Sequence, residues 1–137
     1  MDDVLINKAA IIERCLNRIN EEYLGHESAF DNEFTRQDSI ILNLQRACEA
    51  TIDIGMRLVR LKQLGVPQTS RDVFSMLEEA HLLDSSLSKS LQAMVGFRNI
   101  AIHDYTKMNL EIVHHLIKNN LQDLSTFAQI ALKVALP

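Results

Sequence analysis

The sequence predicts an all-α fold, an up-and-down bundle of four to five helices in which residues 1–137 form one domain. Three observations support this. A chain of 137 residues suits one domain, because a second would need roughly 100 residues of its own. It contains only four glycines and two prolines, which supply few of the turns that a β-sandwich or barrel needs about every 8–12 residues. Its apolar residues, part of a 47% hydrophobic composition, recur with a helical period.

The first two helices are expected over residues 3–23 and 35–61. Each carries one apolar stripe with charged residues off it, the pattern of an amphipathic helix. At the start of the second, Thr35 offers a capping hydroxyl and Asp38 an acid three residues later, which resembles a capping box. Gly55 lies on the apolar stripe of this helix, so we expect a close crossing with another helix there.

Shorter helices are expected in the second half of the chain. The third begins with Ser70 as its N-cap and ends near His81. The fourth restarts at residues 84–86, and the final helix opens near Asn109 and runs to Val134. Short connections between successive helices favour antiparallel neighbours.

Charge, cysteine content and the chain start narrow the function classes. The net charge of −4 argues against a broad basic surface that coats nucleic acid, although a small site gripping one phosphate remains compatible. Cys15 and Cys48 have no metal-site spacing, so we expect two reduced core thiols, with a disulfide as the alternative. Residues 1–8 do not resemble a signal peptide, and no apolar run approaches the ~18 residues that span a bilayer. We therefore expect a soluble, cytoplasmic protein without a metal or other cofactor.

The helical pattern breaks within residues 94–105. The apolar stripe of the fourth helix continues to Arg98, where a core residue should stand. An arginine that is even half-buried needs a partner, because its charge cannot be neutralised at any usual pH. One interpretation pairs Arg98 with Asp104 and leaves His103 satisfied in the core.

The other interpretation is a site that handles phosphate. Arg98 supplies a planar fork for two phosphate oxygens, and His103 can exchange a proton at cellular pH. Tyr105 supplies a neutral donor or acceptor. These three groups suffice for metal-free cleavage of RNA: the histidine takes the 2′-hydroxyl proton or protonates the leaving oxygen, and the arginine stabilises the charged transition state. On an unbroken helix the two side chains stand about 140° apart. Either the helix breaks between them, or a second copy of the chain completes the site.

Arg98, Asn99, His103 and Tyr105 form an R-x4-H-x-Y motif that resembles HepT toxins, a branch of the HEPN superfamily of small helical ribonucleases. Three stretches resemble HepT sequence in the expected order: residues 41–46, 63–71 and 94–105. The resemblance covers essentially the whole chain. It implies that Arg98 and His103 are catalytic, that Asn99 supports them, and that a homodimer lines one cleft with both motifs.

The resemblance also implies a partner and a switch. Tyr105 matches the tyrosine that a minimal nucleotidyltransferase antitoxin, MntA, modifies with AMP in HepT systems. An anionic AMP group beside Arg98 and His103 would occupy the phosphate pocket and repel RNA. The implied function is the toxin of a type VII-like HEPN-MNT toxin–antitoxin system, a metal-independent endoribonuclease that forms a higher-order complex with its antitoxin. The acidic net charge favours a short or structured substrate such as tRNA.

Two other functions stay open. The chain could be a non-catalytic helical subunit that binds a nucleotidyltransferase, or a plain helical dimer in which Arg98 is structural. Two charged groups on the second helix also have no assigned role. Arg46, Glu49 and Asp53 lie on one face of the helix and form either a row of solvated ion pairs or part of a cleft or partner surface. Arg57, Arg60 and Lys62 form a dense basic cluster that could steer RNA.

Overall fold

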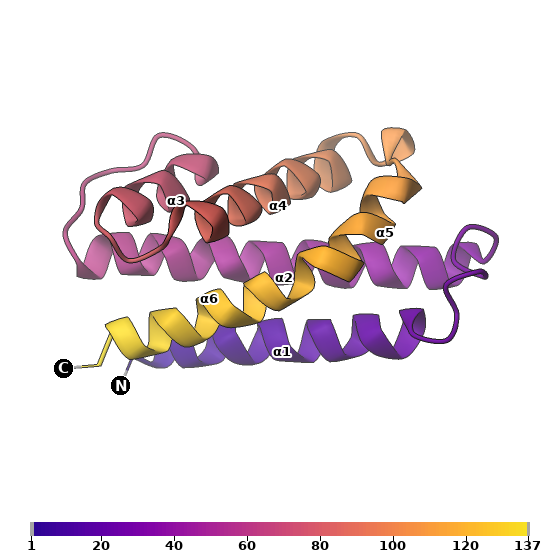
Figure 1. The fold of residues 1–137 in the computed structure, drawn as a ribbon, viewed down its shortest axis with the longest axis horizontal. Coiled ribbons are helices and arrows are strands. Elements are labelled where there is room, and N and C mark those ends of the chain that lie inside the picture. Colours follow the sequence, from indigo (N-terminus) through magenta and orange to yellow (C-terminus); the bar gives the residue numbers. More distant parts are fainter. Residues whose placement is uncertain (1, 137) are drawn as a thin grey trace.

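The computed structural model describes residues 2–136, and every regular element in that range is a helix. In chain order these are α1 (Asp3–Tyr23), α2 (Phe34–Leu61), α3 (Ser70–Glu79), α4 (Ser85–His103), the 3-10 helix η1 (Tyr105–Lys107), α5 (Leu110–Asn119) and α6 (Leu121–Val134). The long helices α1 and α2 lie side by side, α3 and α4 cover one side of α2, and α6 returns across the pair (Figure 1). The predicted all-α fold is confirmed. Within the described range, no helix has the length and apolar character needed to cross a membrane.

The α1–α2 pair is the frame of the bundle. The side chain of Asp2 caps α1 by accepting a hydrogen bond from the first turn, and it also accepts from Nη2 of Arg57 on α2, at 2.7 Å. The hydrogen bond from the Arg57 guanidinium holds the pKa of the Asp2 carboxyl below its usual value. Cys15 and Cys48 are buried and free, as expected, and burial raises the pKa of both thiols.

Gly55 is a point of close approach between α2 and α3. A Cβ atom at Gly55 would lie 2.5 Å from Cγ1 of Val73 and 3.3 Å from the ring of Phe74. No real Cβ atom tolerates the first distance, so a residue without a side chain is required for this packing. The close crossing expected at Gly55 is confirmed, and it fixes where α3 packs on α2.

Two helix starts differ from the sequence expectation. α2 begins at Phe34, and no side chain caps its first turn, so Asp38 does not serve as a capping acid. The N-cap of α3 is Thr69 rather than Ser70, because Thr69 and Asp72 form a reciprocal capping box. The predicted capping roles of Asp38 and Ser70 are therefore wrong, and both side chains are free to contact more distant parts of the chain.

The final helix is bent rather than continuous. Asn120 separates α5 from α6, and its side-chain amide donates to Oγ of Ser90 on α4, at 2.7 Å. The Ser90 hydroxyl in turn donates to Asp123 in the first turn of α6. We call Ser90, Asn120 and Asp123 the α4–α6 clasp. The apolar periodicity predicts one helix here because it continues through the bend, whereas the hydrogen bond found at the bend reaches a residue 30 positions away.

Candidate active site

α4 carries the motif on one unbroken helix. It ends at His103, where the backbone N–H of Asp104 donates to the carbonyl of Ile100 at 2.8 Å. There is no break between Arg98 and His103, so their side chains leave the helix about 140° apart. A break in the helix, one of the two ways in which the sequence could bring these side chains to one phosphate, is therefore ruled out, and completion of the site by a second copy stays a prediction.

Arg98 is half-buried and has an unusual set of partners. Its Nη2 donates to Oγ of Ser70 on α3, at 3.1 Å. Its Nε is buried and has no hydrogen-bond partner within residues 2–136. The Asp104 carboxylate lies 3.3 Å from Nζ of Lys107, so the interpretation that paired it with Arg98 is wrong. The guanidinium therefore keeps donor capacity that the described chain does not use.

A comparison among arginines makes the state of Arg98 distinctive. Three arginines of the described chain are half-buried: Arg36, Arg57 and Arg98. Arg36 lies 3.1 Å from a carboxylate oxygen of Glu22, and Arg57 lies 2.7 Å from one of Asp2. Arg98 has no carboxylate partner among residues 2–136 and relies on a neutral hydroxyl. Because a half-buried cation without a counter-charge is costly, this position is suited to an anion that comes from outside the chain.

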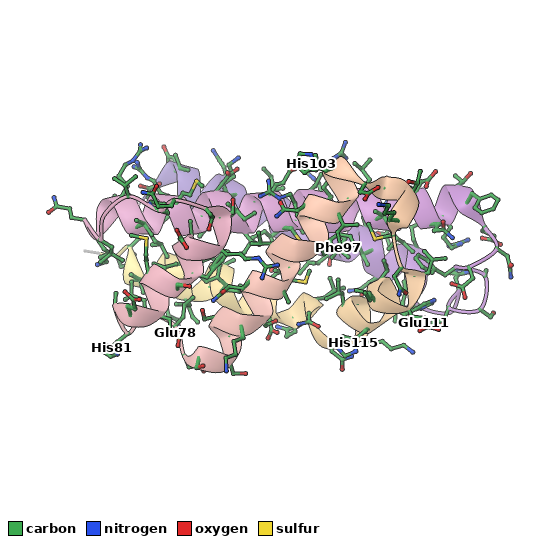
Figure 2. The ribbon with its side chains drawn as sticks, turned by 90° about the horizontal axis from the view of Figure 1, so that it is seen from above. Glu78, His81, Phe97, His103, Glu111 and His115 are labelled. Carbon is green, nitrogen blue, oxygen red and sulfur yellow. The ribbon has the colours of Figure 1, made fainter. Side chains whose placement is uncertain are left out.

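His103 is exposed at the other end of the motif. Figure 2 shows it at the tip of α4 on one edge of the molecule, whereas His115 lies on the opposite edge. Asn99 is also exposed, one residue after Arg98. Ile100 and Ile102 remain 43% and 42% exposed between these polar residues. The turn that ends α4 thus presents an imidazole, an amide and two apolar side chains to the outside.

Tyr105 is the first residue of η1, two residues after the last residue of α4, and is 41% exposed. Its hydroxyl donates a hydrogen bond to Oδ1 of Asp38 on α2. Partial burial, together with this hydrogen bond and the charge of Asp38, raises the pKa of Tyr105 to about 12. Asp38, Leu42, Gln45 and Tyr105 line a pocket of about 360 Å³. At neutral pH the tyrosine is therefore a neutral phenol held at the edge of an open pocket.

Two residues of this region escaped the sequence analysis. The hydroxyl of Ser70 accepts a hydrogen bond from Arg98 and orients it. The sequence could have indicated this contact, because a capping box formed by Thr69 and Asp72 means that Ser70 is not needed as the cap. Arg71 is exposed, and its Nη2 lies 2.6 Å from the point where a Cβ atom of Gly96 would stand. The absence of a side chain at Gly96 thus lets a second guanidinium lie against α4, two residues before Arg98. No local pattern in the sequence indicates that contact.

The remaining charged groups lie elsewhere. Arg57 is already paired with Asp2, which leaves the basic cluster of α2 with one less free cation. The row formed by Arg46, Glu49 and Asp53 lines a pocket of about 300 Å³ against α1, where Asp53 pairs with Lys8 at 2.9 Å. This pocket has no lining residue in common with the pocket beside Tyr105. Across residues 2–136, no three His, Cys, Asp or Glu side chains gather as potential metal ligands.

Comparison with known proteins identifies the family. A family model described as "Ribonuclease HepT-like" matches residues 12–131. The chain belongs to the HepT-like ribonuclease family. A curated relative, the mRNA nuclease HepT of Shewanella oneidensis, is 50% identical over 130 residues, which cover 95% of this chain and 97% of the relative. The resemblance drawn from the R-x4-H-x-Y motif and its flanking sequence is confirmed.

Solved structures of other HepT-like chains share this fold. One is the tri-AMPylated HEPN toxin of Shewanella oneidensis in complex with an MNT antitoxin, with a TM-score of 0.90 at 49% identity over 98% of this chain and 99% of that chain. Another is a toxin–antitoxin complex with AMP-PNP, with a TM-score of 0.91 at 48% identity over 97% and 99% of the two chains. The HEPN-like bundle expected for this HepT-like chain is therefore confirmed.

Proposed function

We propose that this HepT-like chain is the ribonuclease toxin of a HEPN-MNT toxin–antitoxin system and acts in the cytoplasm as a metal-independent endoribonuclease. The observation that carries the proposal is the state of Arg98, a half-buried guanidinium whose Nε has no partner in residues 2–136 and whose Nη2 rests on a hydroxyl. A phosphodiester supplies the counter-charge that this position lacks. The net charge of −4 fits capture of RNA at one such point better than binding along a basic surface.

The proposed chemistry uses Arg98 and His103. The imidazole of His103 takes the proton from a ribose 2′-hydroxyl, and the 2′-oxygen attacks the adjacent phosphorus. As the bond from phosphorus to the 5′-oxygen breaks, that oxygen takes a proton from solvent and His103 then releases its own to solvent, so that the products carry a 2′,3′-cyclic phosphate and a 5′-hydroxyl. Arg98 stabilises the additional negative charge on the phosphoryl oxygens in the transition state. The exposed amide of Asn99 supports the substrate beside them.

A homodimer completes this site in our proposal. Because Arg98 and His103 leave an unbroken α4 about 140° apart, one copy does not aim both side chains at the same phosphate. A second copy placed against the end of α4 brings its own His103 to the Arg98 of the first. The exposed side chains of Ile100 and Ile102 supply apolar contact area for that interface.

Tyr105 is the proposed control point. It directly follows the helix that carries Arg98 and His103, and its hydroxyl is accessible in an open pocket. A relative at 49% identity has been solved with three AMP units, in complex with an MNT antitoxin. Adenylylation of Tyr105 by such a nucleotidyltransferase would place a bulky anion beside Arg98 and block RNA by occlusion and charge.

The cleavage proposal is tested with purified protein, an mRNA and a tRNA pool, with and without EDTA. We expect EDTA-resistant cleavage that leaves 2′,3′-cyclic phosphate ends, and a loss of about 10²–10⁴-fold in the His103→Ala variant. The two RNA pools decide which substrate class is preferred. A requirement for metal, or full activity in His103→Ala, would contradict the proposed mechanism.

The shared site has a test of its own, which uses two inactive variants. Arg98→Ala and His103→Ala are purified separately, mixed and allowed to exchange subunits. A mixed dimer holds one intact site built from both copies, so the mixture should recover about a quarter of the wild-type activity. No recovery despite verified exchange would place both residues of each site on one copy.

The switch is tested by co-expression with the cognate nucleotidyltransferase, followed by intact-mass and peptide-mass spectrometry. We expect added AMP mass on Tyr105, and none in the Tyr105→Phe variant. A neutralised complex in which Tyr105 is unmodified would replace this proposal with neutralisation by simple occlusion.

A further inference from the structure

Asp38 has one polar contact in the described chain, and that contact is the hydroxyl of Tyr105. Its carboxylate forms no ion pair with any lysine, arginine or histidine of residues 2–136, unlike Asp53 further along α2, which pairs with Lys8. It also contributes nothing to capping α2, which begins four residues earlier without a side-chain cap. The structure thus gives this carboxylate no role except its contact with the phenol.

The surroundings of the contact leave room for a reacting group. Asp38 and Tyr105 are both exposed, and with Leu42 and Gln45 they line a pocket of about 360 Å³. The side-chain amide of Gln45 is turned toward Glu49, at 3.4 Å. A nucleotide that enters this pocket from solvent reaches the phenol oxygen while the carboxylate still holds its hydrogen.

We infer that Asp38 is a catalytic residue for the first adenylylation of Tyr105, in which it positions the phenol and accepts its proton. The inference rests on the proposed function of Tyr105 as the acceptor of AMP. It assigns to the toxin part of the chemistry of its own modification. The co-reactant is ATP, delivered by the nucleotidyltransferase.

The chemical need for such a group follows from the state of the phenol. With a pKa of about 12, almost none of Tyr105 is ionised at neutral pH, and a neutral phenol is a weak nucleophile. As Oη forms its bond to the α-phosphorus of ATP, the bond from that phosphorus to the oxygen bridging to the β-phosphate breaks, and pyrophosphate leaves with the electron pair. The phenol proton passes to Oδ1 of Asp38 during the attack and then to solvent.

The inference separates the first AMP unit from later ones. Once Oη carries AMP, it has no proton left to donate to Asp38, and each further unit is attached to the AMP chain instead of the phenol. Asp38 therefore has a role only in the first addition. If the carboxylate merely helped the nucleotidyltransferase to dock, every addition would depend on it equally.

The test follows successive AMP additions by intact-mass spectrometry, with the cognate nucleotidyltransferase and ATP. Asp38→Asn keeps the size of the side chain but removes its capacity to accept a proton. We expect the first addition to slow by about 100-fold, while singly modified molecules gain further units at the wild-type rate. Asp53→Asn, which makes the same charge change on the same helix, serves as the matched control and should react like the wild type.

Three outcomes would overturn the inference: a wild-type first addition in Asp38→Asn, an equal slowing of all additions, or an equal slowing in Asp53→Asn. None of them would affect the proposed role of Tyr105. Conversely, modification of the Tyr105→Phe variant would refute the proposed acceptor itself, whatever Asp38 does. The two failures are therefore distinguishable.

A second readout tests the hydrogen bond without the nucleotidyltransferase. The chain has two tyrosines and no tryptophan, so in a Tyr23→Phe background the phenolate absorbance reports Tyr105 alone. We expect a pKa of about 12 for Tyr105, lowered toward the ordinary tyrosine value of about 10 when Asp38→Asn is added. An ordinary pKa for Tyr105 in the presence of Asp38 would show that the contact does not persist in solution and would overturn the inference.

Discussion

Arg57 and Arg98 are both half-buried arginines on long helices, but they are partnered in different ways. Arg57 donates through Nε and Nη2 to one carboxylate oxygen of Asp2, at 2.9 and 2.7 Å. Arg98 donates to a serine hydroxyl, and its Nε is left without a partner in residues 2–136. The charge of Arg57 is thus balanced by a carboxylate of the same chain, whereas the charge of Arg98 has no carboxylate partner in the described residues and is open to an anion from outside.

The difference is informative because the chain is not short of acids. It has 18 aspartates and glutamates against 14 lysines and arginines, and still Arg98 has no carboxylate partner in the described structure. A neutral partner such as Ser70 orients the guanidinium without cancelling its charge. In an acidic protein, the arginine that lacks an acidic partner is the better guide to an anion site than the overall charge.

The largest expected effect is on the rate of RNA cleavage, when each of these two arginines is replaced by alanine in a separate variant. Arg98→Ala should lower the rate of RNA cleavage by about 10²–10³-fold, with little change in the free energy of unfolding, because no ion pair is lost. Arg57→Ala should show the reverse: wild-type cleavage with a small loss of stability. Single-turnover cleavage and thermal unfolding measure the two effects. Unfolding of Arg98→Ala would instead support the structural role of this arginine.

An intermediate effect is expected at two adjacent residues of α3. Ser70→Ala removes the hydrogen bond that orients Arg98, and cleavage should fall by about tenfold, the scale of one hydrogen bond to a charged group. Thr69→Ala removes the capping box and should lower the stability by about 1 kcal/mol while cleavage stays at the wild-type rate. If both variants lose the same activity, Ser70 acts through the stability of α3 rather than through Arg98.

The smallest expected effect concerns Arg71 and shows whether this arginine belongs to the same anion site as Arg98. In Gly96→Ala the new Cβ would displace the Arg71 guanidinium, from which it would lie only 2.6 Å away. We expect RNA affinity to fall a few-fold, with a salt dependence that is shallower by about one phosphate contact, as in Arg71→Gln. Affinity and salt slope unchanged in both variants would restrict the anion site to Arg98.

The helices themselves could be predicted from the sequence, because each buries one face and the apolar residues recur with that period. The start of α4 and the crossing at Gly55 follow from local patterns of this kind. Arg98 was indicated because an arginine interrupted an apolar stripe, and the roles of His103 and Tyr105 were implied by the resemblance of the R-x4-H-x-Y motif to HepT toxins.

The partners of those residues could not be predicted in the same way. Asp38 and Ser70 both fit local capping patterns, yet Asp38 contacts Tyr105, 67 residues later, and Ser70 contacts Arg98, 28 residues later. Local patterns describe what a short side chain can do for its own helix. They do not reveal that the same oxygen accepts its hydrogen bond from a side chain far along the sequence instead.

The α4–α6 clasp has a consequence for the motion of the motif. Near its start α4 is held by the half-buried hydrogen bonds of Ser90, Asn120 and Asp123, whereas the hydrogen bond between Tyr105 and Asp38, just beyond its far end, is exposed. Free energies of local opening follow burial and contact density, so amide hydrogens around Tyr105 should exchange with solvent long before those around Ser90. The turn that holds Tyr105 can thus open and close while the rest of α4 stays folded.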